Sequence, residues 1–106
     1  MKDTLYIITA PCYRCTRSML VAVIDGKGIM RDPNQFTQNE IRIAREHHVL
    51  ITGHYSGTIQ DTYYANTCPG CNAFIGKRFL FADYFSAALY GDYDFDEIDL
   101  DYGHNT

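Results

Sequence analysis

Residues 11–16 have the sequence PCYRCT, and residues 67–72 have the sequence TCPGCN. Each segment contains two cysteines separated by two residues, a spacing that lets a tight turn direct both sulfur atoms toward one point. Two such turns, brought together, supply four thiolates in a tetrahedral arrangement. The sequence therefore predicts a chain folded around one metal site, with the ligands Cys12, Cys15, Cys68 and Cys71.

We expect the metal to be a single structural zinc ion. Four cysteine ligands complete the coordination shell of zinc and leave no position for water or a substrate. A rubredoxin-like iron site uses the same spacing, and the sequence leaves that alternative open. Two disulfides are disfavoured because no signal peptide is recognisable, so a reducing, cytoplasmic location is expected. A thioredoxin-like redox pair would need a helix after its first cysteine, whereas extended structure is expected after the second pair.

The type of residue that follows each cysteine pair indicates whether the two turns have the same backbone conformation. Turns of this kind usually place a residue with positive φ just after the second cysteine. Asn72 suits that position, because asparagine tolerates the left-handed region better than most residues. Thr16 holds the equivalent position in the first turn, and a β-branched residue is a poor candidate for positive φ. We therefore expect the first turn to have a different local geometry.

Length and composition indicate one small globular domain. The chain has 106 residues, of which 46% are hydrophobic and 21% charged, and this balance excludes global disorder. A domain of this size has a thin core, for which a metal is a useful cross-link. The longest apolar run, residues 19–24, is far too short to span a bilayer, so no membrane association is expected.

Charge is distributed unevenly along the chain. The formal net charge is −4, yet residues 92–106 contain six acids and no lysine or arginine, so the remainder is slightly basic. We expect residues 1–91 to form the domain and residues 92–106 to form an acidic tail. Its acids alternate in part with aromatic and aliphatic residues. The tail is expected either to be disordered in solvent or to dock on a partner.

Hydrophobic patterning predicts an α+β fold of antiparallel strands with one inserted helix. Residues 37–40 have the capping-box form, which predicts a helix from Gln38 to about His48 with His48 on its core face. Residues 79–81 are expected to continue a strand, whereas residues 83–90 fit a short helix equally well. Further strands are expected at residues 5–9, 19–24, 49–52 and 62–65. The fold class is therefore a small antiparallel zinc-ribbon-like domain with one helix between the two cysteine pairs.

A longer motif surrounds the second cysteine pair. Its residues are Tyr55-Ser56, Thr58, Tyr64-Ala65-Asn66, Cys68-Pro69-Gly70-Cys71 and Ala73, followed by Gly76 and Phe79-Leu80. Together with the first pair, this motif resembles a zinc-ribbon-like group of bacterial and phage proteins. Asn72 replaces the glycine usual in that group, and Lys77-Arg78 stands where an acidic residue is common. The resemblance implies the fold and the ligands, and no agreed activity comes with it.

Basic and aromatic residues near the cysteines make nucleic acid a candidate partner. Cationic side chains hold phosphates, and aromatic rings stack on bases. The candidate contacts are Arg14, Arg17, Lys77 and Arg78, with Tyr13, Phe74 and Phe79 nearby. Charged residues beside such turns are more often simply solvated. A protein partner is the other candidate, and no small-molecule substrate is indicated.

An HNH-like metal-dependent nuclease is the alternative function. It resembles this chain in having two cysteine pairs around a histidine-containing segment, here residues 46–48. Such an enzyme needs a hydrolytic metal or an activated water beside the structural zinc. No acidic residue directly precedes His48 and no proline follows it, so we favour a structural-zinc-binding interaction module.

Overall fold

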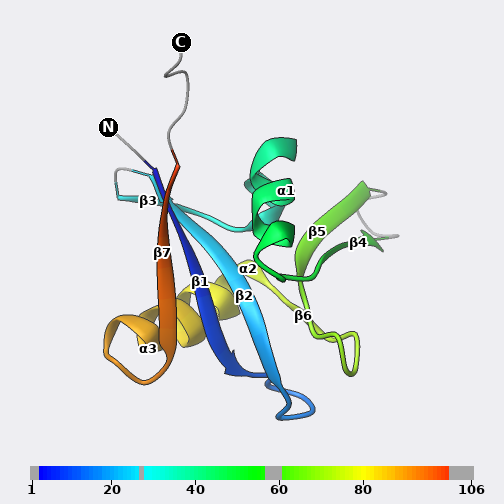
Figure 1. Ribbon diagram of the computed structural model, residues 1–106. Helices are drawn as coiled ribbons and strands as arrows, with labels where there is room; N and C mark the ends of the chain where they lie inside the picture. Colours follow the sequence, from blue (N-terminus) through cyan, green and yellow to red (C-terminus); the bar gives the residue numbers. More distant parts are fainter. Residues whose placement is uncertain (1–2, 27, 57–60, 101–106) are drawn as a thin grey trace.

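The computed structural model describes residues 3–26, 28–56 and 61–100, and it contains two antiparallel sheets (Figure 1). The first sheet consists of β1 (Asp3–Pro11), β2 (Ser18–Gly26), β3 (Ile29–Arg31) and β7 (Asp94–Leu100), in the order β3-β2-β1-β7. The second consists of β4 (Ile51–Ser56), β5 (Asp61–Thr67) and β6 (Phe74–Ile75), in the order β4-β5-β6. The fold class is α+β, and the main helix lies between the two cysteine pairs, as expected.

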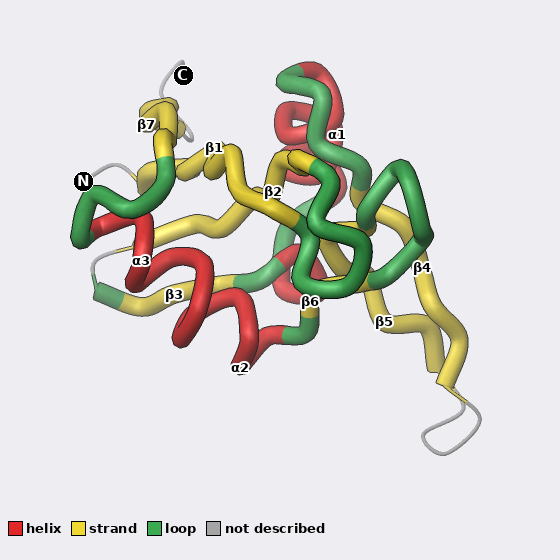
Figure 2. The backbone as a smooth tube through the Cα atoms, turned by 90° about the horizontal axis from the view of Figure 1, so that it is seen from below, coloured by secondary structure: helices red, strands yellow, loops and turns green. Residues whose placement is uncertain are grey.

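The hairpin of β1 and β2 is buried on both faces. Successive side chains of a strand point to opposite faces. On one face, Ile8 and Val21 pack with the helical segment that follows β6, and on the other, Ile7 and Ala22 pack with the main helix and β4. Figure 2 shows these two helical parts on opposite sides of β1 and β2. Burial on both faces explains the unbroken apolar run in β2.

The main helix, α1 (Gln38–Glu46), begins with the predicted capping box. Thr37 Oγ1 accepts a hydrogen bond from the Glu40 amide at 3.1 Å, and Glu40 Oε1 accepts one from the Thr37 amide at 2.8 Å. A 3₁₀ turn, η1 (Pro33–Gln35), precedes it. The expectation that His48 lies on the core face of this helix is wrong. The helix ends at Glu46, and His48 is exposed with a φ of 72°, so Val49 is the residue that returns to the core.

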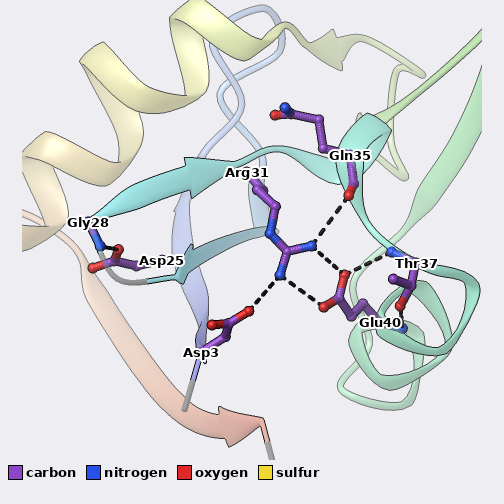
Figure 3. Close-up of polar contacts among 7 residues, drawn as sticks. All are labelled: Asp3, Asp25, Gly28, Arg31, Gln35, Thr37 and Glu40. Atoms are coloured by element: carbon purple, nitrogen blue, oxygen red, sulfur yellow. Dashed lines mark hydrogen bonds and ion pairs between the residues drawn. The ribbon is translucent and has the colours of Figure 1, made fainter. Parts of the chain in front are cut away.

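A charged network joins α1 to the first sheet (Figure 3). Glu40 is buried, and its carboxylate accepts two hydrogen bonds from the Arg31 guanidinium, at 2.8 and 2.9 Å. Arg31 also donates to Asp3 Oδ2 in β1 at 2.9 Å. A buried carboxylate is costly unless it is paired and hydrogen-bonded, and here a bidentate arginine and a capping amide satisfy it. The network thus fixes the start of α1 against β1 and β3.

The segment after β6 is helical, so the strand expected at residues 79–81 is wrong. The helix runs through α2 (Lys77–Phe79), the π-helical η2 (Leu80–Phe85) and α3 (Ser86–Leu89). Leu80, Tyr84 and Ala88 recur every four residues, and all three are buried against the first sheet. The aromatic run is compatible with a strand, but its apolar residues also recur at helical spacing, and this helical face packs on the sheet. None of the described helices combines the length and the apolar character that crossing a bilayer requires.

Asn66 in β5 connects the two sheets. Its side chain is fully buried, and its amide accepts a hydrogen bond from Ala22 N at 2.8 Å and donates one to Ala22 O at 3.0 Å. The backbone of Ala22 has these two groups free because β3 pairs only with residues 24–26 of β2. One side chain therefore supplies the bonds that a further strand would make.

Asn66→Ala is expected to lower the free energy of unfolding by about 2–4 kcal/mol, because it leaves two buried backbone groups without partners. Urea denaturation monitored by circular dichroism measures this change. Asn34→Ala is the matched control, since the Asn34 side chain also accepts from a β5 amide, that of Tyr64, but is exposed. Equal losses from both substitutions would contradict the role given to Asn66.

Most of the acidic segment belongs to the sheet. Residues 94–100 form β7, which pairs with β1 along its whole length, and Leu100 is buried. Phe95 packs on Tyr6 with ring centroids 5.6 Å apart, while Asp94 and Asp96 face solvent. The part of the expected tail at residues 101–106 lies outside the described residues. Phe95 packs on the face that the helical segment covers, whereas Ile98 and Leu100 pack on the other face, so this edge strand contributes to both core clusters.

Removal of residues 92–106 is expected to lower the midpoint of thermal unfolding by about 10 °C or more, because β1 loses a strand partner and Leu100 is lost from the core. Removal of residues 101–106 alone keeps β7 complete and serves as the control. If the longer truncation unfolds at the same temperature as the full chain, β7 does not contribute to the stability of the sheet.

Candidate metal centre

The two cysteine pairs lie in the turns of two hairpins, which we call knuckle 1 (residues 12–17, between β1 and β2) and knuckle 2 (residues 68–73, between β5 and β6). In knuckle 1, the Cys12 amide donates to Arg17 O at 2.8 Å, and the Thr16 amide donates to Cys12 O at 2.9 Å. Knuckle 2 has the same two bonds, from Cys68 N to Ala73 O at 2.8 Å and from Asn72 N to Cys68 O at 2.9 Å. The two turns therefore share one backbone geometry.

The four sulfur atoms converge between the knuckles. All lie within 4.8 Å of one another, and two separations between the knuckles are 3.7 Å from Cys12 to Cys71 and 3.6 Å from Cys15 to Cys68. A tetrahedral site with zinc–sulfur bonds of about 2.3 Å requires sulfur atoms about 3.8 Å apart. The cluster therefore has the size of a tetrathiolate site, and the four cysteines form a candidate metal centre.

Backbone amides of the knuckles point at the sulfur atoms. The Arg14 amide lies 3.4 Å from Cys12 Sγ, and the Gly70 amide lies 3.4 Å from Cys68 Sγ. Hydrogen bonds from an amide to sulfur favour the thiolate over the thiol. Each knuckle thus directs one backbone amide at the sulfur atom of its first, buried cysteine.

The pKa values of the second pair show that the thiols affect one another. Burial raises the pKa of Cys68, but the amides of Cys71 and Gly70 and the neighbouring thiols lower it by more, to about 7. The Ala73 amide lowers the pKa of Cys71, whereas desolvation and the hydrogen bonds shared with the other thiols raise it by more, to about 11. One thiolate therefore forms readily and the next does not. A bound divalent cation supplies the charge that lets all four ionise.

The expectation that knuckle 1 differs from knuckle 2 is wrong. Asn72 has a φ of 64°, as predicted, and Thr16 has a φ of 62°. Thr16 therefore adopts the left-handed conformation despite its branched β-carbon, and its hydroxyl donates to Cys15 O at 2.6 Å. The hydrogen bonds of the hairpin and the convergence of the sulfur atoms impose this conformation, so a strained residue persists beside the site.

Thr16→Asn is expected to raise the free energy of unfolding of the metal-loaded protein by about 1 kcal/mol, because asparagine tolerates positive φ better than threonine. The reciprocal change, Asn72→Thr, should lower it by a similar amount. Chemical denaturation of the two variants and the wild type tests both. A loss of stability in Thr16→Asn would show that strain at this position is not what limits the knuckle.

Tyr84, which sequence analysis did not select, braces knuckle 1 from the helical segment. Its buried phenol donates to Pro11 O at 2.9 Å and accepts from the Tyr13 amide at 3.1 Å. Burial raises the pKa of Tyr84 to about 12, so the phenol keeps the proton that it donates. Its place in an aromatic run gives no indication that it contacts a turn more than 70 residues earlier.

The four predicted nucleic-acid contacts are all exposed, and contacts join knuckle 1 both to knuckle 2 and to the start of the helical segment. Arg17 of knuckle 1 crosses to knuckle 2, where its Cδ would lie 2.8 Å from a Cβ at Gly70. Lys77 and Arg78 line a shallow depression of about 450 Å³ at the start of the helical segment, together with Phe79 and Asp83. Phe79 packs edge-to-face on Tyr13 of knuckle 1 at 4.8 Å, which places this depression beside the knuckle.

The histidines of the nuclease alternative lie apart from the cysteines. His47 caps the C-terminal end of α1, and both His47 and His48 are exposed. Within the described ranges, the cysteine cluster is the one group of histidine, cysteine or acidic side chains close enough to hold a metal ion. No described feature therefore favours a hydrolytic metal at His48.

The fold and the site define a class: a small α+β protein with two antiparallel sheets and a candidate four-cysteine metal centre between two hairpin turns. Comparison with protein-family models, curated proteins and solved structures finds no match to this chain.

Proposed function

We propose that the protein binds one structural zinc ion through Cys12, Cys15, Cys68 and Cys71, in the manner of zinc-ribbon-like proteins. The domain held together by this ion acts as an interaction module for a protein or nucleic-acid partner, in a reducing compartment such as the cytoplasm. The observation that carries the proposal is the convergence of four sulfur atoms from two separate hairpins within 4.8 Å.

A structural role follows from the ligand set. Four thiolates complete a tetrahedral shell, so no position remains for a substrate or a reactive water. The ligands come in pairs from the hairpins of the first and the second sheet, so the ion cross-links the two sheets. Zinc binding at such sites contributes about 10–16 kcal/mol, comparable to or larger than the stability of a whole domain.

An interaction role follows from the same complete coordination shell. Since the metal is not available to a ligand, recognition has to use side chains around it. The exposed side chains of the knuckles include an aromatic and two basic residues, Tyr13, Arg14 and Arg17. Tyr13 adjoins Phe74 and Arg17 adjoins Gly70 only when the two hairpins are joined, so the metal prepares the surface without contacting the partner.

Metal analysis and Cys71→Ser test the proposal together. The purified wild type is expected to contain about one zinc per chain, and iron would instead show visible absorption. Cys71→Ser, or an excess of a strong chelator, should remove the cooperative unfolding transition, because zinc-binding energy is folding energy.

Ala82→Ser is the matched control, since it introduces the same hydroxymethyl group at an exposed position of the helical segment. It is expected to leave both the zinc content and the transition unchanged. A stable, cooperative fold of the metal-free wild type would refute the structural role of the ion.

A further inference from the structure

We propose that the partner of the interaction module is single-stranded nucleic acid, bound across a continuous surface over both knuckles. This inference rests on the proposed function. We call this the knuckle surface, and its residues are Tyr13, Arg14, Arg17, Phe74, Lys77 and Arg78. It combines exposed aromatic rings with basic side chains, the two components by which proteins hold unpaired bases and the phosphates between them.

Two exposed aromatic residues lie side by side at the centre of this surface. Tyr13 belongs to knuckle 1 and Phe74 directly follows knuckle 2, and they are 51% and 45% exposed. The Tyr13 hydroxyl donates to Phe74 O at 3.3 Å, so the two residues adjoin across the junction of the hairpins. Single exposed apolar residues are ordinary on protein surfaces, but an adjoining pair drawn from separate hairpins forms a larger platform.

Both rings are held in place before a ligand binds. The Tyr13 ring packs edge-to-face on Phe79 with centroids 4.8 Å apart, and its backbone amide is bound by Tyr84. The Phe74 ring packs on His54 with centroids 4.5 Å apart and a tilt of 32°. Ordered rings lose little conformational entropy on binding, which favours stacking of bases on them.

The basic residues of the knuckle surface are available for phosphates. Arg31 and Arg42 elsewhere in the protein form ion pairs with carboxylates. By contrast, in the described part of the chain no ion pair involves Arg14, Arg17, Lys77 or Arg78. Asp83 is the one acid that lines the depression with Lys77 and Arg78, so positive charge predominates there.

A row of acidic residues lies along the outer edge of the first sheet. The exposed acids of β7 are Asp94, Asp96, Glu97 and Asp99. This strand is the outer edge of the first sheet, on the side away from the second sheet (Figure 1). Like charges repel, so a polyanion is disfavoured along this edge.

The aromatic pair distinguishes single strands from duplexes. In a duplex the bases are stacked on one another, so exposed rings contribute little and only phosphate contacts remain. Unpaired bases can instead stack on Tyr13 and Phe74 while the phosphates between them reach the basic residues. The surface is therefore expected to prefer single-stranded DNA or RNA, with little dependence on sequence.

Fluorescence anisotropy with labelled oligonucleotides of about 12 nucleotides tests the inference. The zinc-loaded protein is titrated with single-stranded DNA, single-stranded RNA and the matching DNA duplex at low and moderate salt. We expect single strands to bind about tenfold tighter than the duplex, with an affinity that falls as salt rises.

Two pairs of variants separate stacking from charge. Tyr13→Leu and Phe74→Leu keep an apolar side chain but remove a ring, and each should weaken single-strand binding about tenfold. Tyr90→Leu is their control, because Tyr90 is also an exposed aromatic residue, 85% exposed, but lies beyond the helical segment. Arg78→Gln should weaken binding and reduce its salt dependence, whereas Arg42→Gln on α1 removes the same charge and should not.

Zinc content and unfolding are measured on the same samples, so that a lost fold is not mistaken for a lost contact. A folded, zinc-loaded wild type that binds no single strand at low salt overturns the inference and leaves the zinc site and a protein partner standing. Equal affinity for the duplex, or binding unaffected by both leucine variants, also overturns it.

Discussion

The structure depends on the meeting of two hairpin turns at one point. Each sheet contributes one knuckle, and the four cysteine sulfur atoms lie within 4.8 Å of one another only because β1–β2 and β5–β6 approach end to end. A tetrahedral metal demands this approach and stabilises it strongly. Asn66 reinforces the same approach farther from the site, by binding the backbone of β2 from β5. The candidate metal centre and the buried amide of Asn66 thus both join the second sheet to the first, together with the core that the sheets share.

The other elements support the central hairpin and, through it, the site. The helical segment covers one face of β1 and β2 and braces knuckle 1 with the phenol of Tyr84. The helix α1 covers the other face, and the ion pair between buried Glu40 and half-buried Arg31 anchors its first turn. The proposed knuckle surface is a product of this arrangement, since Tyr13 and Phe74 come from different hairpins and adjoin only when the sulfur atoms converge.

Features that depend on residues close in sequence were predicted correctly. Predictions failed where packing between distant parts of the chain decides the structure. The capping box of α1, the positive φ of Asn72 and most strands depend on residues close in sequence. Residues 79–81 have strand-like composition, but the sheet offers a surface on which the helical face of Leu80 and Tyr84 packs. Residues 94–100 resemble a charged tail, yet an unpaired edge of β1 is present to receive them. Thr16 disfavours positive φ, and the hydrogen bonds of the hairpin and the convergence of the sulfur atoms outweigh this preference.

The sequence by itself determined the four candidate cysteine ligands, their grouping in two turns and the antiparallel α+β class, because spacing and periodicity are local properties of the chain. The tertiary structure decided that the sulfur atoms meet, that the last acidic segment is an edge strand, and that Tyr13 adjoins Phe74. It also decided the left-handed conformation of Thr16, the contacts of Tyr84 and the bridge made by Asn66. Each of these features either joins residues far apart in the chain or adopts a conformation that its local sequence disfavours, because burial and the geometry of the site outweigh that preference. The local pattern of residues does not show which of the two effects is larger.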